Sequence, residues 1–313
     1  MTRMILSPRN FSSIRRGSLL AGCLALALFA AALPRVAIAQ FQELVGRVPR
    51  SANAVVILNV EKAKTSPTGV AEGWAAKIEQ AFRDGLIRVP PSAARFVLAS
   101  QIDLEFMSPV WEAAVMDLND APAMALIAKA YRGETDTIEG LPAVALPQDA
   151  YVVKLGPKTL GAMSPANRQA VVRWVRESKS GAAGLSPYLA RAAGYSDRAG
   201  TEIIMALDLE GLLAPQQVAN YLQSCTWLAE QKVDQVKVKD LLMTIEGVRV
   251  GVVLGTPPNG KITIDFKQNA TLAPAVAKRL FLELLAEKGL LIGDLEAWQP
   301  EVKGTTISLA GSL

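Results

Sequence analysis

Apolar and polar residues alternate over three segments of the chain: 201–209, 261–267 and 305–313. In the second segment, Ile262, Ile264 and Phe266 occupy every other position between polar neighbours. This pattern is typical of a strand with one buried and one solvent-facing side, an arrangement found mainly in antiparallel sheets. We therefore predict strands in these segments.

Amphipathic helices are predicted between the strands. Ser66–Pro67 and Ser164–Pro165 each place a capping hydroxyl before a proline that needs no N–H, and Asp120 with Pro122 predicts a similar start. Apolar faces follow the predicted starts at Ser66, Pro215 and Pro274, and they comprise Val70, Trp74, Ile78 and Phe82; Val218, Leu222, Cys225 and Ala229; and Val276, Leu280, Phe281 and Leu284. The interleaved patterns predict an α+β fold with mixed, largely antiparallel sheets and amphipathic helices.

A small, polar stretch at 177–187 (ESKSGAAGLSP) lies between two helical patterns and is the segment most typical of a linker. It divides the chain after residue 39 into two α+β halves, 40–180 and 185–313. Each half contains a strand that leads to a proline-initiated helix, through Leu58–Glu61 in the first and Leu207–Glu210 in the second. Any amphipathic strand followed by a capped helix produces this likeness, so duplication stays open.

The first 39 residues are typical of a secretory signal peptide. They carry five arginines and no acidic residue, an apolar run at 19–33, and the small residues Ala37 and Ala39 before Gln40. The run is shorter than the roughly 20 apolar residues of a membrane span, so we predict cleavage between Ala39 and Gln40. The mature protein is then periplasmic or secreted and has no membrane span.

Two further patterns overlap this leader. Leu20–Cys23 matches a lipobox, although the apolar core that normally precedes the cysteine here largely follows it. Arg15–Arg16 resembles a twin-arginine signal, with flanking residues that fit the pattern poorly. A lipid-tethered form and either export route stay open as alternatives.

Removal of the leader changes the charge and excludes several kinds of chemistry. Five arginines taken from 33 basic residues leave 28 against 29 acidic ones, so the chain loses the cationic excess expected of a nucleic-acid-binding protein. The sequence contains no histidine, and Cys225 is the one cysteine outside the leader. An intrachain disulfide, a Ser-His-Asp triad and a Cys-His pair are therefore excluded in the mature chain.

The loop at 255–263 (GTPPNGKIT) differs by one residue from the phosphate-binding pattern G-x-x-x-x-G-K-[ST], because Ile262 stands at the hydroxyl position. Lys261 also opens a strand where that motif requires a helix. We predict a hairpin that does not bind nucleotide. Ser178–Lys179–Ser180 is interpreted as solvated linker, and Cys225, on an apolar helix face, as a buried and inert thiol.

Carboxylates are the acid-base groups left in number, and glycoside hydrolysis needs only two, about 5–9.5 Å apart. Three pairs at predicted strand ends are candidates: Asp103 with Glu105, Asp117 with Asp120, and Asp208 with Glu210. Polar strand faces and helix caps explain the same residues. A sugar- or peptide-binding cleft could instead use the five tryptophans, although single aromatic residues usually pack in cores: Trp74, Trp111, Trp174, Trp227 and Trp298.

Two segments carry a resemblance to known proteins. They are residues 51–74 (SANAVVILNVEKAKTSPTGVAEGW) and residues 277–313, from AKRLFLELLAEKG to the final TTISLAGSL. Over residues 48–313 the chain resembles uncharacterised exported proteins of planctomycete-type bacteria. The resemblance implies export and no known activity, and it transfers no functional residue.

No catalytic, cofactor-binding or metal-binding residue is therefore assigned, and no cofactor is expected. The missing catalytic groups favour a non-catalytic binding or scaffold module of the cell envelope, whose partner is an unknown protein or envelope component and not nucleic acid. The alternative is a carboxylate-dependent hydrolase acting on extracytoplasmic polysaccharide. Two facing carboxyls in an aromatic-lined groove would favour the hydrolase, and a flat exposed apolar patch would favour the binding module.

Overall fold

The computed structural model of the chain describes residues 41–106, 108–181, 184–199, 201–287 and 293–313. The predictions about the leader lie outside these residues. They comprise the signal peptide at 1–39, its cleavage before Gln40, the lipobox at Cys23 and the twin-arginine pattern.

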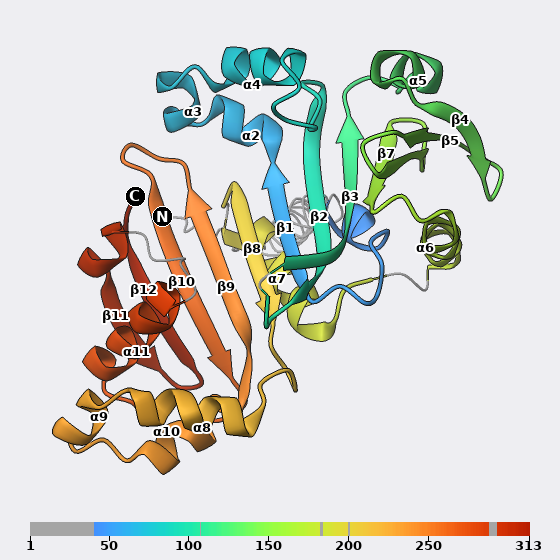
Figure 1. Cartoon of the computed structure of the whole chain (residues 1–313). Coiled ribbons are helices and arrows are strands. Elements are labelled where there is room, and N and C mark those ends of the chain that lie inside the picture. Colours follow the sequence, from blue (N-terminus) through green and yellow to red (C-terminus); the bar gives the residue numbers. More distant parts are fainter. Residues whose placement is uncertain (1–40, 107, 182–183, 200, 288–292) are drawn as a thin grey trace, which may run out of the picture. The chain divides into compact units, whose positions relative to one another are not determined.

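The strands of the described residues form one 12-stranded sheet in which all neighbours run antiparallel (Figure 1). In spatial order they are β11 (Gln299–Lys303), β12 (Thr306–Ser312), β10 (Asn259–Phe266), β9 (Ile245–Val253), β8 (Ile203–Asp208), β1 (Ala54–Asn59), β2 (Ala93–Asp103), β3 (Ser108–Leu118), β7 (Thr159–Ser164), β6 (Ala150–Lys154), β5 (Leu141–Leu146) and β4 (Glu134–Ile138). The strands predicted from alternation correspond to β8, β10 and β12. The predicted α+β class is confirmed.

Around the central pair β1 and β8, the two halves of the chain repeat one order of elements. In the first half β1 leads to α2 (Val60–Thr65), α3 (Pro67–Ala71) and α4 (Trp74–Arg83), then the β2–β3 hairpin and α5 (Met124–Tyr131). In the second half β8 leads to α8 (Pro215–Ser224), α9 (Trp227–Glu230) and α10 (Gln235–Leu242), then the β9–β10 hairpin, α11 (Pro274–Glu287) and the short helix η1 (Gly293–Ala297). The first half adds the β4–β5 hairpin and ends in α6 (Arg168–Ser180), and α7 (Pro187–Ala199) precedes β8.

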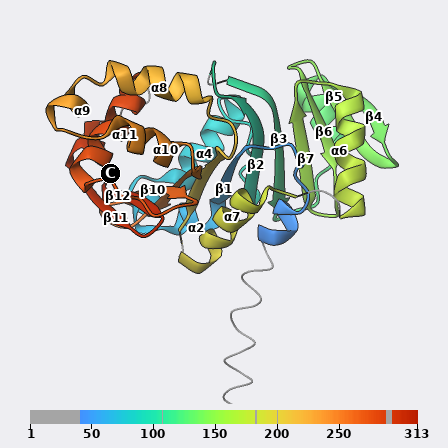
Figure 2. The ribbon, with the colours of Figure 1, turned by 90° about the horizontal axis from the view of Figure 1, so that it is seen from below.

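One face of the sheet carries the main core. Alternate residues of the central strands, including Val55 and Ile57 of β1 and Ile204 of β8, are buried there with side chains from α6, α7 and the helical turn at 41–45. Figure 2 shows α7 on this side of the sheet and α8 on the other. Full burial of each such aliphatic side chain stabilises the fold by roughly 1.5–3 kcal/mol.

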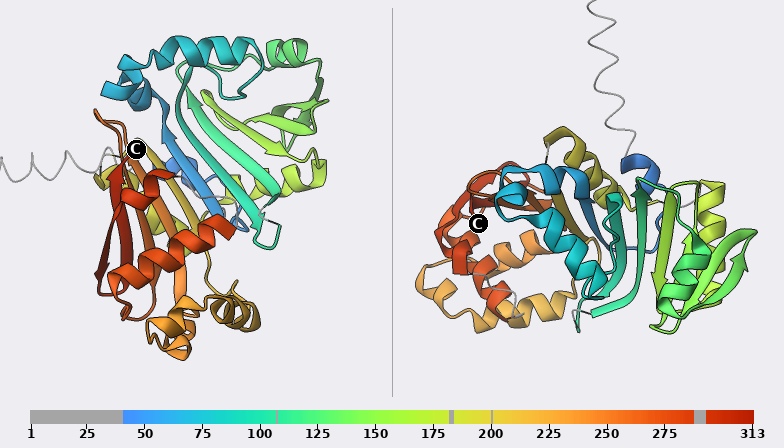
Figure 3. Two further views of the ribbon diagram at one scale, coloured as in Figure 1. Left: turned by 60° about the vertical axis from the view of Figure 1, so that its left-hand side comes forward. Right: turned by 90° about the horizontal axis from the view of Figure 1, so that it is seen from above.

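The opposite face is covered in two separate places. In the second half α11 lies against this face of the sheet (Figure 3), and its Phe281 belongs to the same core cluster as Ile262 and Ile264 of β10. In the first half, Val60 of α2 packs with Met116 of β3. The middle of this face is therefore less covered than its two ends.

The helix predicted from Ser66 is interrupted, so the prediction of one continuous core-facing helix is wrong. Ser66 does cap α3, because its side-chain oxygen accepts the N–H of Gly69 at 3.0 Å. Gly73 then adopts a left-handed conformation with φ of 64°, which ends one helix before α4 begins. No residue of α4 is fully buried, so its apolar stripe, including Trp74, does not belong to the core.

The start predicted at Ser164–Pro165 is also wrong. Ser164 is the last residue of β7, and α6 begins at Arg168, where the side-chain oxygen of Asn167 accepts the N–H of Ala170 at 3.1 Å. The predicted linker is shorter than expected, because residues 177–180 form the last turn of α6. An Asn cap satisfies the same free N–H groups that the serine was expected to satisfy.

Candidate functional site

Helix α6 contributes to two hollows on the main-core side of the sheet. Its buried residues Val171, Trp174 and Val175 face that core. A Cβ on Gly161 of β7 would lie 2.6 Å from the Trp174 ring, so only glycine permits this close approach. The indole N–H of Trp174 donates to the backbone oxygen of Arg47 at 2.6 Å. This bond holds the segment that follows the 41–45 turn against α6.

Ion pairs hold α6 against the β4–β5 hairpin. Arg168 pairs with Asp136 and Arg176 pairs with Glu139, each at 2.9 Å. The hydrogen bond from Arg168 is the main reason why the pKa of Asp136 lies below its usual value. The hydrogen bond from Arg176 likewise lowers the pKa of Glu139. The position of α6 thus depends in part on a hairpin that has no counterpart among the described residues of the second half.

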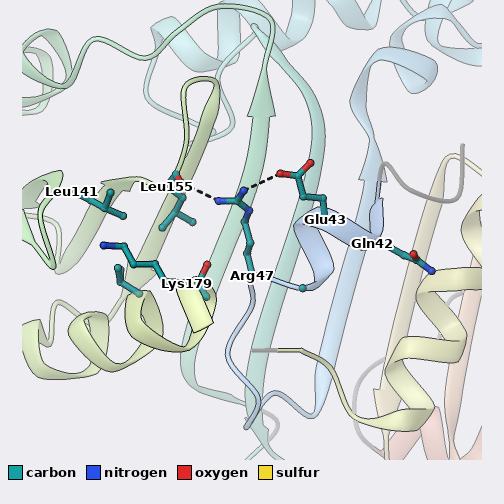
Figure 4. Close-up of a pocket in the computed structure, with 9 residues that line it drawn as sticks. Gln42, Glu43, Arg47, Leu141, Leu155 and Lys179 are labelled. Atoms are coloured by element: carbon teal, nitrogen blue, oxygen red, sulfur yellow. Dashed lines mark hydrogen bonds and ion pairs between the residues drawn. The ribbon is translucent and has the colours of Figure 1, made fainter. Parts of the chain in front are cut away.

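The first hollow, called the Arg47 cavity, has a volume of about 390 Å³ (Figure 4). It is lined by Gln42, Glu43, Gly46, Arg47, Leu141, Leu155, Val175, Ser178 and Lys179. Arg47 donates to the backbone oxygen of Leu155 at 2.9 Å and pairs with Glu43 at 2.8 Å. Lys179 donates to the backbone oxygen of Glu139. The cationic groups of this cavity are therefore already bonded within the chain.

The second hollow, called the Trp111 hollow, has a volume of about 480 Å³. It is lined by Pro49, Ser51, Gln101, Val110, Trp111, Met163, Pro165, Asn167, Ala170, Arg173, Trp174 and Glu177. These residues come from β2, β3, β7, the connection between β7 and α6, α6 itself and the segment after residue 48. Its volume lies within the range of roughly 300–1,000 Å³ that small-ligand sites usually occupy.

The Trp111 side chain is held in place by its neighbour across the β2–β3 ladder. Gln101 and Trp111 are paired in register, and the indole N–H donates to the Gln101 side-chain oxygen at 2.8 Å. Trp111 is partly buried and packs against the main core. The amide nitrogen of Gln101 keeps its two donors for another partner.

Several other polar groups of the Trp111 hollow make no side-chain hydrogen bond or ion pair in the part of the chain that the structure describes. Among the residues that the structure describes, the side chains of Ser51, Arg173 and Glu177 have no hydrogen-bond or ion-pair partner. Asn167 uses its side-chain oxygen to cap α6, which leaves its amide nitrogen as a donor. The hollow thus presents donors, an acceptor and one charge of each sign beside an indole ring.

The predicted carboxylate pairs at 103–105 and 208–210 have structural roles. Asp103 accepts the N–H of Glu105 at 2.8 Å, and Asp208 accepts the N–H of Glu210 at 3.0 Å, so both aspartates stabilise turns at strand ends. Asp208 also accepts the hydroxyl of Ser186. Neither pair lines the Arg47 cavity or the Trp111 hollow.

The third predicted pair is also outside the two hollows. Asp117 forms an ion pair with Arg95 and accepts the hydroxyl of Thr159 at 3.0 Å. Asp120 is exposed and does not cap α5, whose N-cap is Ala123. Glu177 was not among the carboxylates predicted from the sequence, and it is the one carboxylate among the residues that line the Trp111 hollow.

Residues 254–258 connect β9 and β10, and Asn259 at the start of β10 pairs with Val253 at the end of β9. The hairpin prediction is therefore confirmed, and Lys261 lies within β10 rather than at a helix start. The Thr68 hydroxyl donates to the backbone oxygen of Gly255, which ties the loop to α3. The geometry that presents amide N–H groups to phosphate at a helix start does not form at this loop.

The predictions for the two nucleophile candidates have different outcomes. Cys225 is buried, as predicted, although it follows α8 as its C-cap. Burial is the main cause of the raised pKa of its thiol, which lowers the fraction of reactive thiolate. Ser178 and Lys179 lie in the last turn of α6 and line the Arg47 cavity, so their interpretation as linker residues is wrong.

A further apolar surface lies in the middle of the opposite sheet face. Met205 of β8 is exposed, and its neighbours in register, Val56 of β1 and Val250 of β9, are only partly buried. Met205 is the exposed member of this row, whereas Val250 packs against the core cluster of the second half. A single exposed apolar side chain is common on protein surfaces and does not by itself indicate a binding site.

The comparisons with known proteins give distant structural matches. Neither a family model nor a curated protein matches the chain. Among solved structures, crystal form I of TP0453 is 7% identical, with a TM-score of 0.48 over 86% of this chain and 92% of that one. Crystal form III of TP0453 is 8% identical, with a TM-score of 0.47 over 86% and 93%.

The described residues lack two features that would define other types of site. None of the helices in that part of the chain has both the length and the apolarity needed to cross a membrane. Within the same residues, no group of three or more His, Cys, Asp or Glu side chains is placed to hold a metal ion.

Proposed function

We propose that the mature chain is an exported envelope protein that binds its partner in the Trp111 hollow and leaves that partner chemically unchanged. The observation that carries this proposal is the set of unused polar side chains, Ser51, Arg173 and Glu177, beside the Trp111 ring. Ligand sites usually combine apolar and aromatic walls with a few polar side chains, and seven of the twelve residues that line this hollow are apolar.

The carboxylates support binding over hydrolysis. Glycoside hydrolysis uses two carboxyl groups on either side of the scissile bond, and Glu177 is the one carboxylate among the residues that line this hollow. The aspartates predicted from the sequence, such as Asp103 and Asp117, are bonded elsewhere. The polysaccharide hydrolase is therefore the less supported of the two hypotheses.

The location of the partner follows from the predicted leader. Residues 1–39 have the composition of a signal peptide, and the remaining chain is close to neutral. The protein then acts in the periplasm or outside the cell, on a protein or another envelope component. Proteins bind nucleic acid through cationic surfaces, so a near-neutral mature chain is not expected to bind it.

Photo-crosslinking in the native envelope tests this function. A photoreactive residue at Val110, on the rim of the hollow, should crosslink to an envelope component, and the crosslink should disappear when Trp111→Ala is added. The matched control is Val236 of α10, another exposed valine that lines neither hollow, and it should give no such product. Equal crosslinking from both positions would contradict the proposal.

A turnover screen completes this test. Purified mature protein is incubated with polysaccharide, peptidoglycan and ester substrates, and products are sought by mass spectrometry. We expect none. Turnover that is lost in a folded Glu177→Gln variant would establish the hydrolase instead.

A further inference from the structure

We infer that the ligand of the Trp111 hollow is a neutral saccharide. This inference rests on the proposed function and names the ligand class of the same site. It depends on three properties of the hollow: its aromatic wall, its balanced polar groups and its place on the sheet.

The aromatic wall suits a sugar ring. A pyranose ring carries C–H groups on its two faces and hydroxyl groups around its rim, so it is apolar above and below and polar at the edge. The face of an indole ring is apolar with a negative π-system, which attracts such C–H groups. Trp111 is the partly exposed indole of the hollow, and its bond to Gln101 holds the ring in one orientation. Trp174 lies deeper and is buried.

The unused polar groups suit the rim of the same ring. Each sugar hydroxyl donates one hydrogen bond and accepts others. Glu177 supplies acceptor oxygens, and Arg173 supplies a planar set of donors. The amide nitrogens of Gln101 and Asn167 add donors, because their oxygens are already bonded to Trp111 and Ala170. The hollow therefore offers an acceptor for the hydrogen bond that a sugar hydroxyl donates and donors for those that it accepts.

The charge of the hollow favours a neutral ligand. Arg173 is the one cationic residue of its lining and Glu177 the one anionic residue. Phosphate and carboxylate ligands are usually held by clusters of Arg or by helix starts. Here the start of α6 is already capped by Asn167.

The place of the hollow on the sheet disfavours an extended peptide. Extended peptides commonly bind by adding a strand to a free sheet edge, where unpaired backbone groups are available. The hollow lies over β2, β3 and β7, which are interior strands, and β3 is paired on both sides. A ligand at this position must be recognised through side chains, as the ring and rim of a saccharide allow.

The test is calorimetric titration of the mature exported protein with three probes of similar length: the hexamer of N-acetylglucosamine, cellohexaose and hexaglycine. Trp111→Ala removes the stacking surface, and Trp111→Phe keeps an aromatic ring. The matched control is Phe106→Ala, because Phe106 is 74% exposed on the same hairpin and does not line the hollow. Urea unfolding of each variant shows that it is folded.

We expect at least one saccharide hexamer to bind the wild-type protein and Phe106→Ala equally. Trp111→Ala should raise its Kd by about tenfold or more, the size of loss typical of a central aromatic contact. Trp111→Phe should have an intermediate Kd. The saccharide should be recovered intact after the titration.

The remaining outcomes separate this inference from the proposed function. Absence of saccharide binding at millimolar concentration overturns the saccharide inference. In that case Trp111-dependent binding of hexaglycine, or Trp111-dependent crosslinking from residue 110, would preserve the proposed function. Saccharide binding that is unchanged in Trp111→Ala overturns the inference as well, because the ligand then lies elsewhere. Cleavage of the saccharide would contradict the proposed function itself.

Discussion

The Arg47 cavity and the Trp111 hollow share helix α6 and have similar volumes, but they differ in how their polar groups are used. In the Arg47 cavity, Arg47 is bonded to Leu155 and Glu43, and Lys179 is bonded to Glu139. In the Trp111 hollow, Arg173 and Glu177 have no partner within the described residues. The first set of groups holds the chain together, and the second is available to a ligand.

This difference shows that volume alone does not identify a binding site. Loss of a group that is bonded within the chain lowers stability, because its former partner loses a hydrogen bond. Loss of a group that contacts only the ligand lowers the affinity for that ligand and changes the stability of the protein little. Stability and affinity are therefore separate measures of what the polar groups of the two hollows do.

The largest expected effect is on stability, from Trp174→Ala. Trp174 is 2% exposed and packs on Gly161, so its removal leaves a cavity behind α6 and should lower the free energy of unfolding by about 3–5 kcal/mol. Urea unfolding measures this change. Trp111→Ala should lower the same quantity much less, because Trp111 is partly exposed. Equal losses of unfolding free energy in the two variants would contradict the assignment of Trp174 to the core and of Trp111 to the ligand site.

The next effect concerns the Arg47 cavity. Arg47→Met keeps the apolar stem and removes the bonds to Leu155 and Glu43, so we expect a loss of about 1–2 kcal/mol with unchanged ligand affinity. Arg173→Met is the matched change in the Trp111 hollow. It should alter stability by less than about 0.5 kcal/mol and should weaken binding. The reverse pattern would mean that the two hollows have been assigned the wrong roles.

A smaller effect is expected in acid, where the attachment of α6 weakens. The pKa of Asp136 is lowered in the folded protein by its hydrogen bond from Arg168. The stabilisation is therefore complete above the unfolded pKa of about 4 and is lost as the pH falls through the lower folded value. The urea concentration at the unfolding midpoint should decrease when the pH is lowered from 7 to 3. The decrease should be smaller in the Asp136→Asn variant. An identical decrease of the urea midpoint in the variant would show that the Arg168–Asp136 ion pair does not contribute to the pH dependence of stability.

The smallest effect is expected at Cys225, which lies in a separate core cluster of the second half. A thiol reagent should label it slowly in the native protein and fully in denaturant, because burial raises the pKa of the thiol. Trp111→Ala should leave the native labelling rate unchanged. A faster rate would show that the change at the hollow is not local.

The strands could be predicted from the sequence because their pattern is local. Alternation of apolar and polar residues identified β8, β10 and β12, and the Pro-Pro-Asn-Gly loop identified the β9–β10 hairpin. The helices were less predictable, because tertiary packing decides which apolar stripe is buried. The stripe through Trp74 and Ile78 has helical spacing, yet α4 buries no residue.

The binding site could not be predicted from the sequence for a different reason. Its main residues, Gln101, Trp111 and Glu177, are separated by up to 76 positions and meet only through the register of β2 and β3 and the placement of α6. Nothing in the local pattern distinguishes Trp111 from Trp174, although one is partly exposed and the other is buried. The same pattern selected carboxylates that stabilise turns and omitted Glu177.

The most direct test of the account compares one ligand with two variants. The saccharide hexamer that binds the wild-type protein is titrated into the Trp111→Ala and Arg47→Met variants. The Kd of each variant is then compared with that of the wild-type protein. We expect Trp111→Ala to weaken binding by about tenfold or more and Arg47→Met to retain the wild-type Kd, although Arg47→Met is the less stable variant. Equal Kd values in the two variants would contradict the assignment of the Trp111 hollow as the binding site.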